Sequence, residues 1–124
     1  MSVRPFTKID TVLLRVKSLE ESKRWYEDVL GFKATYLDQA ERLVVFDVGG
    51  ETSLTIWELK QGKATHRSGG SPCFPLLYTR DIRAAWKTLT GRGVKASEVQ
   101  GDSGGTMWFT FEDPDGNKIE ACSY

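Results

Sequence analysis

The chain has 124 residues, the length of one compact domain, and it can bury a hydrophobic core without a disulfide or a structural metal. Hydrophobic residues make up 40% of the chain and charged residues 27%, which excludes an intrinsically disordered protein. Lys and Arg together number 17, as do Asp and Glu, so the formal net charge is zero. We therefore expect no nucleic-acid partner and no attraction to an anionic membrane.

The cysteine and histidine content argues against several classes of metal site and catalytic site. Cys73 and Cys122 have neither the spacing of a metal cluster nor that of a disulfide framework, and we interpret both as inert free thiols in a reducing compartment. His66 is the only histidine, which argues against a zinc enzyme with several histidine ligands and against a Ser-His-Asp hydrolase. No signal peptide or membrane-length apolar run is seen, so we expect a cytoplasmic protein.

The first half of the chain predicts a strand, a helix and three more strands. Ile9–Val16 is rich in Val, Leu and Ile, as strands are. Ser18 with Glu21 three residues later is a capping box, and Gly31 stands where glycine ends helices. The three further strands are predicted at Phe32–Tyr36, Arg42–Val48 and Thr52–Leu59.

The second half predicts the same order of elements. Phe74–Thr79 is the first strand, and Asp81 caps a helix that runs from Ile82 to about Thr90. Asp113-Pro114-Asp115-Gly116 predicts a tight turn, because proline presets the turn and glycine accepts its left-handed position. The remaining strands are predicted at Val94–Val99, Thr106–Phe111 and Asn117–Ser123.

A sequence repeat supports this order independently. Gly31-Phe32-Lys33-Ala34 matches Gly93-Val94-Lys95-Ala96 at an offset of 62 residues. The chain is therefore predicted to be an α+β protein of two tandem βαβββ modules, and a unit of about 60 residues buries too little surface to be stable alone. We expect the two sheets to pair, within one chain or between two, into a half-open, curved mixed sheet with a concave cleft as the binding site. The first module, the linker and the second module are predicted at about 8–60, 61–71 and 72–124.

Two motifs resemble the vicinal oxygen chelate superfamily, which includes glyoxalase I, bleomycin resistance proteins and extradiol dioxygenases. The closing motif runs from Phe111 to Glu120 and reads FEDPDGNKIE. The opening motif starts at Val12 with VLLRV and continues to Phe32. The resemblance covers essentially the whole chain and implies a single domain of this fold over residues 1–124. It says little about activity, because one fold serves many functions.

The resemblance also implies four metal-ligand positions, on the first and last strand of each module. In this sequence those positions are Thr11, Glu58, Phe74 and Glu120. Phenylalanine cannot bind a metal and a threonine hydroxyl is a poor ligand for a transition metal, so we expect no catalytic metal. Two carboxylates and a hydroxyl would hold a hard divalent cation only weakly, with several waters.

Glu58 and Glu120 are the candidate catalytic residues. Strand alternation places Glu58 on the same face as Ile56, with Trp57 pointing the other way and packing under the helix. If the modules pair, the two carboxylates meet in the cleft as a proton-transfer base or a cation site, with one pKa raised. The alternative is that both are structural remnants of the family's metal site.

The candidate ligand-binding residues are further strand residues whose side chains should face the cleft, because side chains alternate between the two faces of a strand. They combine aromatic rings with polar groups that would orient a planar or amphipathic ligand. The same composition would equally suit a filled apolar seam between two subunits. These residues are Thr11, Arg15, Phe74, Tyr78 and Trp108.

The sequence thus favours a cytoplasmic, homodimeric small-molecule-binding protein of the glyoxalase/bleomycin-resistance type, holding an organic ligand in an aromatic cleft. The alternative is a glyoxalase-like lyase, isomerase or resistance enzyme that uses Glu58 and Glu120 with a divalent metal. A third interpretation is a protein-interaction or effector-sensing module whose cleft serves only as the dimer seam.

Overall fold

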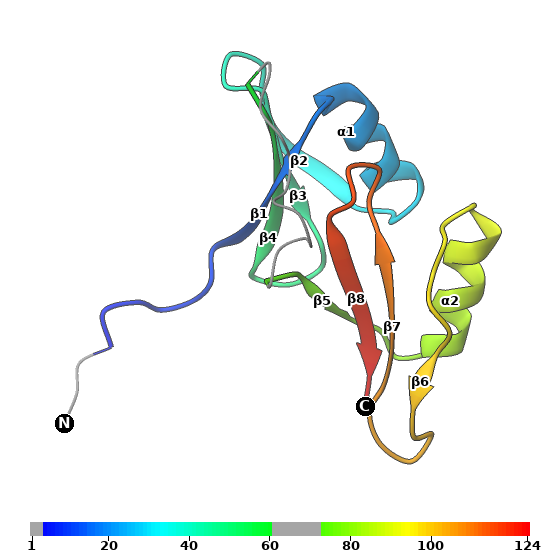
Figure 1. The fold of residues 1–124 in the computed structure, drawn as a ribbon. Helices are drawn as coiled ribbons and strands as arrows, with labels where there is room; N and C mark the ends of the chain where they lie inside the picture. The colour runs from blue at the N-terminus through cyan, green and yellow to red at the C-terminus, as the bar shows by residue number, and fades with distance from the viewer. Residues whose placement is uncertain (1–3, 61–72) are drawn as a thin grey trace. The chain divides into compact units, whose positions relative to one another are not determined.

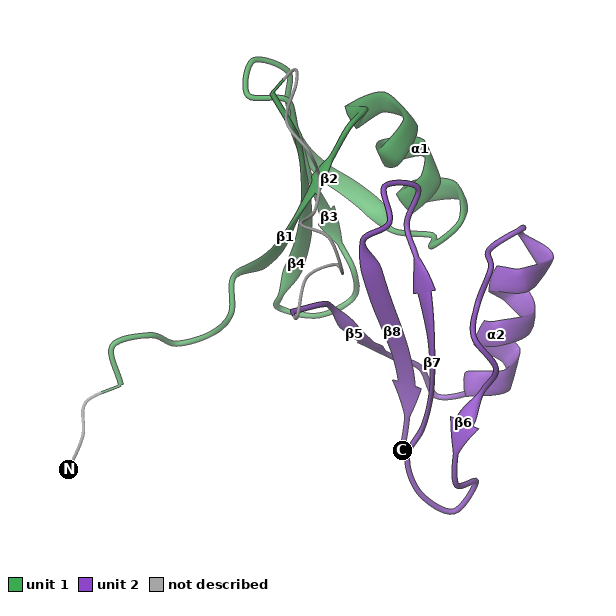
Figure 2. Cartoon of the chain, viewed as in Figure 1, with its two compact units in different colours: residues 1–61 green, residues 62–124 purple. Residues whose placement is uncertain are grey.

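The computed structural model describes residues 4–60 and 73–124. The chain divides into two compact units, Met1–Gln61 and Gly62–Tyr124, and each has the predicted βαβββ order (Figures 1 and 2). The predicted linker, with His66, lies entirely outside the described residues. No helix among the described residues is long and apolar enough to cross a membrane.

The first unit is a mixed four-stranded sheet with one helix. Its strands lie in the order β1-β4-β3-β2, with β1 parallel to β4 and the other neighbours antiparallel. The elements are β1 (Thr11–Val16), α1 (Leu19–Asp28), β2 (Lys33–Asp38), β3 (Leu43–Asp47) and β4 (Ser53–Glu58).

Local signals determine where α1 begins and ends. The Ser18 hydroxyl accepts a hydrogen bond from the Glu21 backbone N–H at 3.3 Å. At the other end, Gly31 has a φ of +72°, and its N–H donates to the carbonyl of Glu27 at 3.1 Å. This is the left-handed glycine stop of the αL motif, so both predicted helix ends are confirmed.

The core of the first unit lies between α1 and the sheet. Tyr26 on the helix is fully buried, and its ring centre lies 5.6 Å from that of Phe46 on β3. Val16, Val44 and Ile56 complete the buried face of the sheet. The opposite face, which we call the first open face, is not covered by a helix of this unit. Its side chains on β1 and β4 are Thr11, Leu13, Arg15, Thr55 and Trp57.

The second unit repeats this plan. Its strands lie in the order β5-β8-β7-β6, with β5 parallel to β8, and its helix packs on one face of the sheet. Phe109, Phe111 and Ile119 form the buried face of that sheet. The elements are β5 (Leu76–Tyr78), α2 (Ile82–Gly91), β6 (Gln100–Gly101), β7 (Met107–Glu112) and β8 (Lys118–Ser123).

The predicted strand at Val94–Val99 is wrong. Val94 lies beyond α2 but takes part in its C-terminal cap, because its N–H donates to the carbonyl of Leu89 at 3.0 Å. Further along, the Ser97 hydroxyl accepts the N–H of Thr110 at 2.9 Å, in place of the backbone carbonyl that a ladder would offer. A single isolated bridge pairs this segment with β7, and the regular ladder starts only at β6.

The turn between β7 and β8 forms as predicted. The N–H of Gly116 donates to the carbonyl of Asp113 at 3.0 Å, and Gly116 has a φ of +82°. Asp113 is buried, and its carboxylate accepts the N–H groups of Asp115 and Asn117 and the side-chain amide of Asn117. The Asp113 carboxylate therefore stabilises the turn with three hydrogen bonds.

Candidate functional site

Glu58 lies on the helix-covered side of the first sheet. Alternation correctly places it on the face of Ile56, but that face is the one beneath α1. One carboxylate oxygen accepts the backbone N–H of Leu19, the first residue of α1, at 2.8 Å. Arg42 donates to both carboxylate oxygens, from Nε at 2.9 Å and from Nη2 at 2.8 Å. Glu58 therefore ties the start of the helix to the sheet.

The electrostatics of Glu58 agree with this structural role. The hydrogen bonds from Arg42, and then that from Leu19, hold the pKa of Glu58 below its ordinary value. Arg42 also pairs with Glu20 at 2.7 Å, and its hydrogen bonds to Glu58 and Glu20 raise its own pKa. The Glu58 carboxylate already accepts three hydrogen bonds, two of them from a guanidinium, and is therefore a poor proton-transfer base.

The expectation that Trp57 packs under the helix is wrong for the same reason. Trp57 lies on the first open face, where the guanidinium carbon of Arg15 stands 4.4 Å from its ring centre. Arg15 also donates to the backbone carbonyls of Trp57 and Glu58, each at 3.1 Å. Arg15 is thus held over the aromatic ring of Trp57 on the first open face.

Thr11 has a partner on this face that sequence reasoning missed. Its hydroxyl lies 2.7 Å from the hydroxyl of Thr55 on the neighbouring strand β4. In the parallel ladders, Leu13 stands opposite Thr55 and Leu76 stands opposite Glu120. Thr55 is therefore the residue of the first unit that corresponds to Glu120. The signal was the strand register, which the sequence alone does not show.

The second unit brings the other candidates onto its uncovered sheet face, which we call the second open face. Trp108 and Thr110 alternate with buried residues of β7, and Thr110 stands opposite Glu120 on β8. The Glu120 side chain is half-buried. Among residues 4–60 and 73–124, no group forms an ion pair or hydrogen bond with its carboxylate.

Phe74 and Tyr78 lie at the β5 edge of the second open face. The Phe74 ring has the ammonium of Lys118 4.1 Å from its centre. Tyr78 is 54% exposed, and its ring centre lies 4.9 Å from that of Tyr124. These two aromatic side chains are accessible to a partner or a ligand, but strand β8 separates them from Trp108 on β7.

Cys122 shares the second open face, where it stands opposite Tyr78 on one side and Trp108 on the other. It is buried, and burial followed by the negative charge of Glu120 raises the pKa of its thiol. The thiol stays protonated at neutral pH, in agreement with its interpretation as inert. Cys73 is exposed, and neither cysteine forms a disulfide.

The four positions implied for a metal do not fit one. Phe74 offers no donor atom, and Glu58 is turned under α1 and already bound by Arg42. Thr11 offers a hydroxyl that already bonds to Thr55. Glu120 alone presents a carboxylate to an open face, and one carboxylate is not a transition-metal site. Within the described residues, no three His, Cys, Asp or Glu side chains gather in a group that could hold an ion.

Comparisons with known proteins agree on one family. The model of the Glyoxalase/Bleomycin resistance protein/Dioxygenase superfamily matches residues 8–121. A Salmonella typhimurium protein named Virulence protein STM3117 is 28% identical over 122 residues, which cover 94% of this chain and 84% of that protein.

Solved structures give the same picture. A superfamily member from Sphaerobacter thermophilus is 26% identical, with a TM-score of 0.78 over 96% of this chain and 98% of that one. TnmS3, described as an antibiotic binding protein from Streptomyces sp. CB03234, is 21% identical, with a TM-score of 0.77 over 98% of both chains. The second likeness is one of fold alone.

Proposed function

Because the chain belongs to the Glyoxalase/Bleomycin resistance protein/Dioxygenase superfamily, we propose that it is a small-molecule-binding protein that holds an organic ligand without a catalytic metal. The proposed contacts on the second open face are Trp108, Thr110 and Glu120. Thr11 and Arg15 are the proposed contacts on the first open face. That the same fold occurs in a protein described as antibiotic-binding supports a binding role.

The contrast between the two carboxylates carries this proposal. Glu58 is bound by Arg42 and by the N–H of Leu19, so its charge is used within the fold. Glu120 has no such partner among the described residues, and it shares the second open face with the half-buried Trp108, which stands diagonally across from it on β7. An unpaired carboxylate next to an aromatic face suits a planar ligand that carries a positive charge or a hydrogen-bond donor.

Nuclear magnetic resonance of the indole N–H groups tests this proposal directly. The chain has four tryptophans, so the Trp108 signal is one of four and is assigned with Trp108→Phe. The probe is acridine orange, a planar cation, with neutral acridone as its matched control. We expect acridine orange to shift the Trp108 signal saturably. Glu120→Gln should weaken this binding about fivefold, the upper range for one exposed ion pair, and leave acridone unaffected.

A matched variant makes the result specific. Glu98→Gln removes one carboxylate from the same unit at a residue outside the second open face, and it should leave the binding of acridine orange unchanged. Equal binding by the wild-type protein and Glu120→Gln would contradict the proposed role of this carboxylate. Failure of both probes to move the Trp108 signal would contradict the binding surface itself.

Glu120 also favours a second candidate, a glyoxalase-like enzyme. A carboxylate with no partner among the described residues is free to accept a proton from a bound substrate, as a general base must. Incubation with methylglyoxal and glutathione, with and without added Ni²⁺ or Zn²⁺, tests this candidate. Thioester formation that is lost in Glu120→Gln, while the fold is retained, would replace the binding proposal by the enzymatic one.

We further propose a cytoplasmic location, which the absence of a disulfide at Cys73 and Cys122 supports. Cysteines without a disulfide are typical of proteins in a reducing compartment. Fractionation of cells that express the tagged protein checks the location, and recovery outside the cytoplasmic fraction would contradict it.

A further inference from the structure

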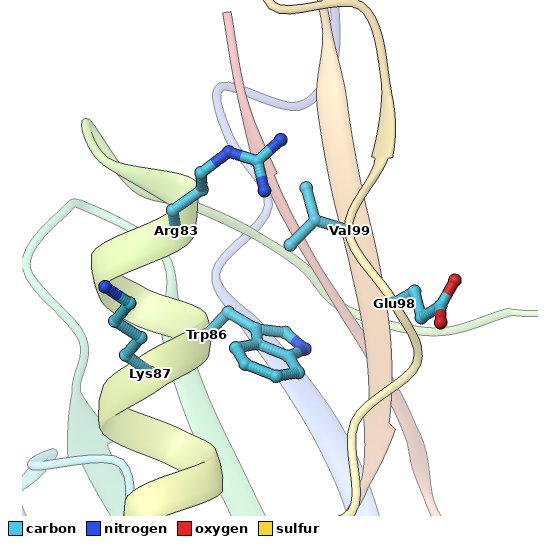
Figure 3. Close-up of a pocket in the computed structure, with 5 residues that line it drawn as sticks. All are labelled: Arg83, Trp86, Lys87, Glu98 and Val99. Atoms are coloured by element: carbon cyan, nitrogen blue, oxygen red, sulfur yellow. The ribbon is translucent and has the colours of Figure 1, made fainter.

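The second unit has a pocket formed by helix α2 and the segment that leads to β6. Five residues line it: Arg83, Trp86, Lys87, Glu98 and Val99, as Figure 3 shows. Its volume is about 360 Å³, which lies at the small end of the range for ligand sites. None of these residues is among the proposed ligand contacts of either open face.

Trp86 gives the pocket a rigid aromatic wall. Its indole N–H donates to the backbone carbonyl of Ser97 at 2.8 Å, which fixes the orientation of the ring. The ring points from α2 toward the segment that carries Glu98 and Val99, and Trp86 is only half-buried (Figure 3). A fixed and partly exposed indole face is a stacking surface for a planar group.

Two positive charges stand beside this wall. Arg83 and Lys87 are four residues apart on α2, and this spacing places them on one side of the helix. Within the described part of the chain, neither side chain has an ion-pair or hydrogen-bond partner. Figure 3 shows Arg83 reaching toward Val99, whereas the carboxylate of Glu98 points away from the helix and the ammonium of Lys87 lies on the side of α2 away from the Trp86 ring. The positive charge that faces the pocket is therefore that of Arg83.

We propose that this pocket is a binding site for a small planar carboxylate, such as an aromatic acid of one or two rings. The aromatic ring would stack on Trp86, and the carboxylate would bind the guanidinium of Arg83, whose geometry allows two parallel hydrogen bonds. Lys87 would add a second, less directional charge. The proposal does not rest on ligand binding at the open faces.

Titration with naphthoate, followed by the indole N–H signals, tests this site. Naphthamide is the matched probe, because it keeps the rings and removes the charge. We expect naphthoate to shift the Trp86 signal saturably and naphthamide to bind about fivefold more weakly, as one exposed ion pair allows. The amide signals of Ser97 and Val99 should move with that of Trp86.

Arg83→Gln and Lys87→Gln are the decisive variants. Both residues are exposed, and among the described residues their side chains form no ion pair or hydrogen bond, so the variants should fold. Their other indole signals report whether they do. Arg83→Gln should weaken naphthoate about fivefold and leave naphthamide unchanged. Equal affinity for both probes, an unchanged affinity in Arg83→Gln, or a shift confined to Trp108 would overturn the proposal. A shift confined to Trp108 would leave the proposed function standing.

Discussion

At the scale of single residues, the charge of Glu58 stabilises the fold. Its carboxylate receives two hydrogen bonds from Arg42 and one from the N–H of Leu19, and its side chain is 20% exposed. Glu58→Gln should therefore lower the free energy of unfolding by about 1–2 kcal/mol at neutral pH. Denaturation by urea, followed by circular dichroism, measures this loss.

The pH dependence of that loss has a definite sign. The pKa of Glu58 in the folded protein lies below its ordinary value of 4.5, so the stabilisation is fully present above pH 4.5. It disappears as the pH falls through the folded pKa, and the two proteins should then become equally stable. Glu27→Gln is the control, because its exposed pairing with Lys23 should contribute only about 0.3 kcal/mol. An undiminished difference at low pH would show that the charge of Glu58 is not its cause.

The two thiols should differ in reactivity. Cys73 is exposed, whereas burial and the charge of Glu120 raise the pKa of Cys122. At neutral pH, Ellman's reagent should therefore react rapidly with Cys73 and slowly with Cys122, since the thiolate is the reactive form. In denaturant both should react rapidly. Two equally fast thiols in the native protein would contradict the burial of Cys122, and Cys73→Ser identifies the fast one.

Sequence patterns predict which residues share a face but not which face the helix covers. Alternation grouped Glu58 with Ile56, and the structure confirms that grouping. The helix covers that same face, so Glu58 is turned away from the open face on which Trp57 lies. Arg42 and Glu58 are 16 residues apart in the sequence and meet across a turn. No local sequence pattern predicts such a pair.

At the scale of elements, signals confined to a few neighbouring residues were reliable. Ser18 and Gly31 mark the ends of α1, and Asp81 caps α2 by accepting the N–H of Ala84 at 3.0 Å. The strand predicted at Val94–Val99 failed because its pairing depends on a distant strand. There the hydroxyl of Ser97 takes the hydrogen bond from Thr110 that a regular ladder needs.

The turn between β7 and β8 depends on one side chain. Asp113 is buried and accepts hydrogen bonds from two backbone N–H groups and one amide. Asp113→Ala would leave these donors without their acceptor, so we expect a loss of about 2–3 kcal/mol in the free energy of unfolding. Thermal and urea denaturation measure it.

Asp102 provides the control for this prediction. Its carboxylate accepts one N–H, that of Gly104, in an exposed loop. Asp102→Ala should therefore cost less than about 1 kcal/mol. Similar losses in Asp102→Ala and Asp113→Ala would show that the buried hydrogen bonds of Asp113 are not what holds the turn.

At the scale of the whole molecule, the repeat predicted the two units correctly. Each has its own helix, its own four-stranded sheet and its own buried aromatic residues, such as Tyr26 and Phe109. The two units nonetheless carry different side chains at corresponding positions of their open faces. Thr55 pairs with Thr11 where Glu120 stands without a partner among the described residues. A search for ligands should therefore treat the two open faces as different surfaces.

The last prediction concerns assembly, since we propose that the chain forms a homodimer. Large apolar side chains gather on the edge strand β5 and the end of the chain, where Leu76 is 56% exposed and Tyr124 is 83% exposed. Phe74 and Tyr78 belong to the same edge cluster. Several exposed apolar side chains along one sheet edge are typical of an interface between subunits.

Leu76→Glu should disrupt that dimer, because a buried and unpaired carboxylate at an interface is costly. Sedimentation velocity should show a dimer for the wild-type protein and a monomer for Leu76→Glu. Leu37→Glu is the matched variant, since Leu37 is also exposed but lies on β2 of the first unit, and it should remain dimeric. Glu120→Gln should remain dimeric too, because it keeps the size of the side chain opposite Leu76 and adds no charge there. A monomeric wild-type protein would contradict the dimer, and a dimeric Leu76→Glu would place its interface elsewhere.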